Sequence, residues 1–364
     1  MKKLLFAVSL ISLLALSGCD KKEEQGSGST EPTTASVTPA EQREEKVKES
    51  AGYLPRVLEN TAKAIAAGET SLGLHLRDID VTTQVGGLEN FGLDIQASIN
   101  PKDENNHVKA AAELDFGGKV NVSFTEQQAQ LVGVPSLAGL SINEDLTGAS
   151  ASVYLKDNVV YADASDTEAL TVAQHIVPKF VPELGEMTPL QFIEQYIGAN
   201  HKVKYSDIGE VKMFTEEEIE SAVADLQKNV DEMEIKGIDD SAFDFVDSII
   251  GGLVQPDGSL RFVTKINKTT LYKIALLEAE SMEEIEEVNT QFARFSDLSF
   301  NILFTTDAQL RFNQFVFTFS VAGNDEKFGQ FAVDGQIDMS MTYGEFKLQF
   351  PESFGDYVEF VKPE

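Results

Sequence analysis

The residues that could carry out acid–base or metal chemistry in this chain are few and scattered. Its four histidines, His75, His107, His175 and His201, have neither helical-face nor zinc-ligand spacing. The sequence has no Gly-x-Ser-x-Gly elbow, no phosphate-binding Gly-x-x-x-x-Gly-Lys-Ser/Thr loop and no Gly-x-Gly-x-x-Gly fingerprint. Its 60 acidic residues guarantee chance carboxylate pairs, so paired acids alone do not indicate an active site. We therefore expect a protein that is not an enzyme, and we predict no catalytic residue, metal site or cofactor.

The one residue with predicted covalent chemistry is Cys19, the only cysteine in the chain. A single cysteine can build neither a disulfide framework nor a cysteine-based zinc site. Two lysines and an apolar run, residues 4–16, precede it, and this run has the length of a signal-peptide core. Leu16-Ser17-Gly18-Cys19 resembles the lipobox of bacterial lipoproteins. The alternative is a cleaved secretory signal that contains a cysteine by chance.

The lipobox resemblance implies that residues 1–18 are a signal peptide and that Cys19 carries acyl chains such as palmitate. Two or three acyl chains anchor a protein stably to a membrane. The expected location is the cell membrane, facing the periplasm or the exterior, and Asp20 implies the inner membrane if the cell is Gram-negative. Residues 19–40 lack periodic apolar residues, so we expect a disordered tether.

The charge of the chain excludes some partners. With 29 basic and 60 acidic residues the formal net charge is −31, which argues against nucleic-acid binding and disfavours an anionic lipid surface. The acids could instead suggest calcium. However, the loop at residues 100–106 lacks the alternating acids and central glycine of an EF-hand, so we interpret it as a solvated turn.

After the tether, the first half of the remaining chain has the sequence pattern of a helix followed by strands. A helical pattern covers residues 41–67, with Pro55 as a kink or as the first turn of a second helix. Alternating apolar residues then predict strands around residues 72–76, 93–99, 108–116 and 120–124. Gly117-Gly118 predicts a hairpin turn between the last two, and Lys156-Asp157-Asn158 predicts another hairpin turn.

The second half changes from helices to strands. Residues 167–252 read as helical, with a capping box at Thr215 to Glu218 and a further helix over residues 240–250. A short helix is predicted at residues 282–292, between strands at 260–266 and 298–304. A break in the alternation at Asn313-Gln314 predicts a β-bulge. Strands over residues 310–321 and 331–341 follow, and Phe346, Leu348 and Phe350 alternate after a turn at residues 343–345. Beyond the bulge three phenylalanines share one strand face and are the candidate ligand-binding residues: Phe315, Phe317 and Phe319.

These patterns predict an α+β protein with curved antiparallel sheets and covering helices, and they are compatible with two similar halves. The expected segments of the body are a helix with a sheet at residues 41–166, a helical segment at 167–252 and a phenylalanine-rich sheet at 253–364. The pattern of strand and turn residues at 153–161, 258–262 and 343–351 resembles that of the half-barrel in lipid-carrying lipoproteins of the LolA, LolB and LppX type. This resemblance covers about a fifth of the chain, and the long helical middle departs from it.

Three functions remain open at this point. The first is an anchored envelope lipoprotein that binds a lipid or another hydrophobic ligand on a curved sheet. The second is a lipoprotein with a filled core that has a structural role or binds a protein partner. The third is an unrecognised hydrolase. Ordinary core packing explains the phenylalanines about as well as a ligand site does.

Overall fold

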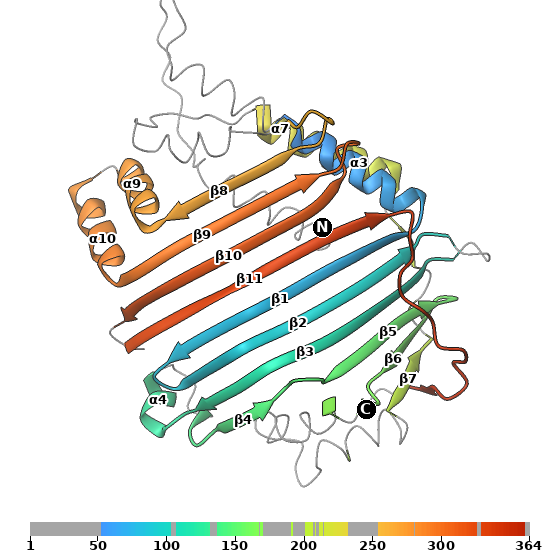
Figure 1. The fold of residues 1–364 in the computed structure, drawn as a ribbon, viewed down its shortest axis with the longest axis horizontal. Coiled ribbons are helices and arrows are strands. Elements are labelled where there is room, and N and C mark those ends of the chain that lie inside the picture. Colours follow the sequence, from blue (N-terminus) through green and yellow to red (C-terminus); the bar gives the residue numbers. More distant parts are fainter. Residues whose placement is uncertain are drawn as a thin grey trace, which may run out of the picture.

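Long runs of alternating residues form the strands of one large sheet in the computed structural model (Figure 1). The structure describes residues 52–102, 107–131, 137–166, 168–169, 191, 201–206, 208, 211–213, 215–231, 254–279, 281–325 and 329–360. The predicted signal peptide, Cys19, the whole of the predicted tether and the helix expected at 240–250 lie outside these residues.

The strands in chain order are β1 (Thr70–Thr83), β2 (Gly86–Asn100), β3 (Lys109–Ser123), β4 (Ser141–Asp145), β5 (Ser150–Lys156), β6 (Val159–Asp163), β7 (Lys202–Tyr205), β8 (Arg261–Asn267), β9 (Phe295–Thr306), β10 (Phe312–Asp325), β11 (Gly329–Tyr343) and β12 (Val358–Glu359). The helices are α3 (Leu54–Ala67), α4 (Glu126–Leu131), α7 (Glu216–Asp231), α9 (Lys268–Glu278) and α10 (Met282–Ala293). In the view of Figure 1 the helices lie near the strand ends, with α3 and α7 at one end and α9 and α10 at the other.

The strands pair in the order β12-β7-β6-β5-β3-β2-β1-β11-β10-β9-β8, and β4 pairs with part of β3. Every pair between named strands is antiparallel except β12 with β7. The predicted α+β class with a curved antiparallel sheet is therefore confirmed. Because β1 pairs with β11, the two predicted sheet segments join into one sheet. The two similar halves stay a prediction.

Several local predictions are confirmed. Helix α3 begins with Pro55 in its first turn and ends before Gly68. The Thr215 hydroxyl accepts from the Glu218 amide at 3.2 Å, and the Thr215 amide donates to the Glu218 carboxylate at 2.8 Å, which is the predicted capping box of α7. The β9–β10 register shifts between Phe312 and Gln314, where the bulge was predicted.

The hairpin expected at Gly117-Gly118 is wrong, because β3 runs straight through both glycines. Gly118 has φ +80°, and a Cβ there would lie 2.3 Å from the backbone oxygen of Asn90. The register between β2 and β3 shifts at the same place, between Glu89 and Gly92. Two residues of β2, Asn90 and Phe91, therefore lie opposite Gly118 alone, and the glycine permits the close approach of this bulge to β3.

Two other expectations need correction. Residues 202–205, in the segment expected to be helical, form β7 and extend the sheet. Phe346, Leu348 and Phe350 form no strand after the turn at Gly344. They belong instead to a segment, residues 345–360, that packs on one end of the sheet and ends in β12. We call this segment the C-terminal strap.

Candidate functional site

One face of the sheet is apolar across five neighbouring strands. Residues that lie directly opposite each other in an antiparallel pair point to the same face, so the register assigns side chains to faces. We call the following set the central apolar face: Phe300, Ile302 and Phe304 on β9; Phe315, Phe317 and Phe319 on β10; Ile337, Met339 and Met341 on β11; Leu72, Leu74 and Leu76 on β1; Leu93, Ile95 and Ala97 on β2. None of these side chains is charged.

The three predicted ligand-binding phenylalanines lie in one row along β10. The ring centroids of Phe315 and Phe317 are 6.5 Å apart, and those of Phe317 and Phe319 are 5.6 Å apart, both in stacked geometry. Phe300 on β9 stacks on Phe317 at 5.7 Å with an interplanar angle of 10°. The pattern in the sequence thus placed these rings together correctly, while their role in binding stays a prediction.

The central apolar face is not sealed from solvent. Phe315, at 9% exposure, is its one buried residue, and the other members are half-buried. A sheet face that packs fully against a second layer would bury large apolar side chains of this kind. The aromatic and aliphatic surface is therefore available for further contact.

The opposite face, which we call the polar face, carries charged residues in its middle. A cross-strand row contains Asp338, His75, Asp94 and Asp115, on β11, β1, β2 and β3 respectively. The His75 Nδ1 contacts the Asp94 carboxylate, and the Gln314 side-chain amide donates to Asp338 at 3.2 Å. These contacts link neighbouring strands. On the other side of the imidazole, a Cβ at Gly73 would lie 3.0 Å from both His75 Nε2 and the Ser340 hydroxyl oxygen, so a serine on β11 lies near the ring.

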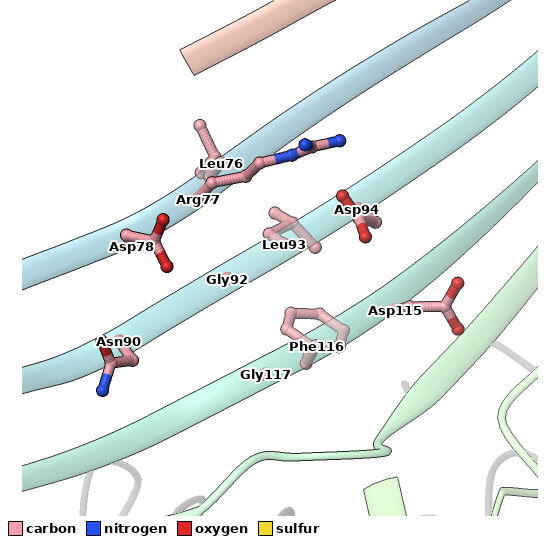
Figure 2. A pocket seen from close by; sticks show the side chains of 10 residues that line it. All are labelled: Leu76, Arg77, Asp78, Asn90, Gly92, Leu93, Asp94, Asp115, Phe116 and Gly117. Atoms are coloured by element: carbon pink, nitrogen blue, oxygen red, sulfur yellow. The ribbon is translucent and has the colours of Figure 1, made fainter. Parts of the chain in front are cut away.

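A hollow of about 290 Å³ lies beside this row (Figure 2). Gly92 and Gly117 lie opposite each other in it, so neither strand contributes a side chain there. Asp78 and Asp115 are well separated from each other in Figure 2, and their carboxylates do not converge. Within the residues that the structure describes, no group of three or more His, Cys, Asp or Glu side chains could hold a metal ion.

Sequence reasoning missed an aromatic cluster beneath the C-terminal strap. Tyr161 lies 4.0 Å from Phe354 and 5.3 Å from Tyr357, measured between ring centroids. Tyr154 packs against Phe350 at 5.5 Å. Burial raises the pKa of Tyr357. The alternation of Phe346, Leu348 and Phe350 was visible in the sequence, but it gave no sign that this segment packs on the polar face.

Lysines surround this cluster. The ammonium groups of Lys109 and Lys156 lie 4.4 and 5.7 Å from the ring centroids of Phe350 and Phe354, in cation–π geometry. Lys202 pairs with Asp163 at 3.1 Å. Burial alone would raise the pKa of Asp163, but hydrogen bonds from Ser165 and Lys202 outweigh it, and the pKa is lowered.

No model of a known protein family matches the sequence, and no curated protein is significantly similar to it. No helix in the described part of the chain is long and apolar enough to cross a lipid bilayer. The candidate site therefore rests on its own geometry.

Proposed function

We propose that this protein is an envelope lipoprotein, anchored through acylated Cys19, that binds the hydrocarbon part of a lipid or a similar hydrophobic ligand on the central apolar face. The proposal assigns no catalytic step to the protein. Phe315, Phe317 and Phe319, with Phe300 beside them, contribute the aromatic part of the binding surface.

The observation that carries the proposal is the combination of apolar character and incomplete burial on this face. Fourteen of its fifteen members are only half-buried, and none is charged. Apolar surface left in contact with water is unfavourable by about 25 cal/mol per Å², so a ligand that covers it gains affinity. Soluble proteins seldom keep large apolar patches unless they bind something there.

The chemistry of the face favours hydrocarbon over a protein surface as the ligand. Protein interfaces carry about one hydrogen bond per 100–200 Å², and the members of the central apolar face have no polar side-chain group to offer. The seven strands from β8 to β3 span roughly 29 Å at a strand spacing of about 4.8 Å, which is wide enough for extended chains. The resemblance to lipid-carrying lipoproteins implies an open curved sheet. The sheet of this protein is open, which also supports the proposal.

Photolabelling with a diazirine analogue of palmitic acid tests the proposal on the full chain in membranes. We expect adducts at Phe315, Phe317 and Phe319, which excess palmitate suppresses, and none at Val316 or Thr318. The latter side chains point to the polar face of the same strand. Equal labelling of both sets would contradict a specific hydrocarbon site.

A pair of variants separates binding from packing. Phe317→Ala should weaken labelling and should cost less stability than the about 3–5 kcal/mol typical of a sealed core. Leu303→Ala is the control, because Leu303 is half-buried on the neighbouring strand but lies on the polar face. A full core-sized loss of stability, together with no labelling of the wild type, would leave the filled-core, protein-binding lipoprotein as the better explanation.

A further inference from the structure

Exposed apolar side chains gather at one edge of the sheet. The described residues include six exposed large hydrophobic side chains, and three of them lie on the same face of β5, β7 and β12: Val153 at 39%, Tyr205 at 41% and Val358 at 48%. Val153 lies opposite Ala162, Ala162 opposite Val203, and Val203 opposite Val358. We call Val153, Tyr205 and Val358 the edge patch.

The edge patch is continuous with the central apolar face. Val153 lies opposite Ala112 on β3, which lies opposite Ala97 on β2, and Ala97 lies opposite Leu72 on β1. All of these residues therefore point to one side of the sheet. Because β12 is the last strand in the order of the described sheet, the apolar surface extends to the final strand on this side.

Charges near the edge patch are largely balanced, in contrast to the net charge of −31 of the whole chain. On β5, β6, β7 and β12 the apolar side of the sheet carries no acidic residue, as the register shows. On the polar side Lys202 pairs with Asp163, and Lys204 lies 3.9 Å from Glu359. On the same side Lys109 and Glu113 on β3 and Lys156 on β5 carry further charges of both signs. Electrostatic repulsion between this edge and lipid headgroups is therefore weaker than the repulsion expected for a surface with an excess of acidic residues.

We propose that the edge patch contacts the surface of a zwitterionic bilayer, and that the hydrocarbon ligand passes there between the membrane and the central apolar face. This inference rests on the proposed function. Tyrosine is enriched where proteins meet the interfacial region of membranes, because its ring is apolar and its hydroxyl is wet. Small aliphatic neighbours such as Val153 and Val358 add apolar area that a bilayer surface can cover.

Collisional transfer of a fluorescent fatty acid tests this inference. The full chain, reconstituted in phosphatidylcholine vesicles and loaded with the probe, is mixed with acceptor vesicles that contain a quencher. If transfer requires contact, its rate should rise in proportion to the acceptor concentration. Val153→Glu should lower that concentration dependence by about tenfold, a factor that corresponds to about 1.4 kcal/mol.

Val263→Glu is the matched control. Val263 is also 39% exposed and also lies on a strand, but it points to the polar face of β8, near the opposite margin. Its transfer rate should equal that of the wild type. Val153→Thr, which keeps the β-branched shape, covers the case in which the glutamate variant folds poorly and should give a smaller loss in the same direction.

The outcomes separate this inference from the proposed function. A transfer rate independent of acceptor concentration, or equal losses in Val153→Glu and Val263→Glu, would overturn membrane contact at the edge patch even if the central face is still photolabelled. Transfer that occurs only to vesicles carrying a second membrane protein would assign the edge patch to a protein partner and also overturn it. Absence of photolabelling in the wild type would instead overturn the proposed function.

Discussion

Ser71 and Ser98 lie directly opposite each other on β1 and β2, and their hydroxyl oxygens are 2.7 Å apart. The Ser71 hydroxyl donates to the backbone oxygen of Glu345 at 2.9 Å, so the Ser98 hydroxyl donates to Ser71. Both oxygens accept from the backbone amide of Lys347, at 3.2 and 3.1 Å. This serine pair fixes the start of the C-terminal strap to the polar face, in place of the ladder bonds that a strand would have formed.

Replacement of Ser98 by alanine should destabilise the protein by about 1–3 kcal/mol, because buried donors of the strap lose an acceptor. Ser98 is 2% exposed, so water cannot easily replace its hydroxyl. Denaturant unfolding measures the effect. Ser296→Ala, at an exposed position of β9, should stay within about 0.5 kcal/mol of the wild type. Equal stability of the two variants would show that the serine pair does not hold the strap.

Gly118→Ala should be strongly destabilising, whereas Gly117→Ala should not. An alanine at position 118 would need a positive φ and would meet the backbone of Asn90 and Phe91, so we expect a loss of at least about 2 kcal/mol. A Cβ at position 117 meets no atom within 4 Å. Thermal melts of the two variants, one residue apart in the same strand, provide the comparison. Similar melting temperatures would contradict the close approach at the bulge.

Stability should fall at alkaline pH in a way that depends on Tyr343. Burial raises the pKa of Tyr343 to about 12, above the ordinary value near 10. The folded state therefore holds the phenolic proton more tightly than the unfolded state, and the resulting stabilisation is complete below pH 10 and is lost as the pH rises towards 12.

Tyr343→Phe should flatten this decline between pH 10 and pH 12, measured as the urea midpoint. The variant should also lose about 1 kcal/mol at neutral pH, because the Tyr343 hydroxyl donates to the backbone oxygen of Phe312 at 2.7 Å. Tyr205→Phe, at an exposed tyrosine, should leave the slope unchanged. A slope identical in all three proteins would contradict the assignment to Tyr343.

Cys19→Ser should abolish membrane anchoring and leave the precursor unprocessed, because the lipobox resemblance assigns both events to this thiol. Fractionation of cells, followed by intact-mass measurement, reports the outcome. We expect wild type in the membrane pellet with added acyl mass, and the variant with residues 1–18 still attached. A variant found in the membrane pellet at the mature mass of the wild type would refute the interpretation that acylated Cys19 anchors the protein.

The sequence predicted those features of the fold that depend on neighbouring residues. Alternation located most of the long strands, although it divided β3 into two. The parity change at Asn313-Gln314 located a real bulge, because a shift of one residue moves every later side chain to the other face. The capping box at Thr215 was readable because it is completed within one helical turn. The shared face of Phe315, Phe317 and Phe319 followed from the same period of two.

Features that depend on distant partners were not predictable. Gly117-Gly118 has the composition of a hairpin turn, and only the opposite backbone at Asn90 shows why two glycines lie within a strand. The four residues of β7 are too few and too polar to show a strand pattern. The extent of the apolar face, and with it the edge patch, depends on the register of strands brought together from remote parts of the chain.

The pairing of β1 with β11 sets a constraint on the order of folding. Thr70 lies opposite Tyr343. The strand β1 is therefore synthesised long before β11, the strand with which it pairs. Until β11 arrives, a strand of 14 residues has an open edge that could pair with another chain. Contacts of such large sequence separation also form slowly. Refolding of the full chain should therefore be slow and sensitive to protein concentration, and a chaperone that covers β1 until β11 has been synthesised would reduce misassembly.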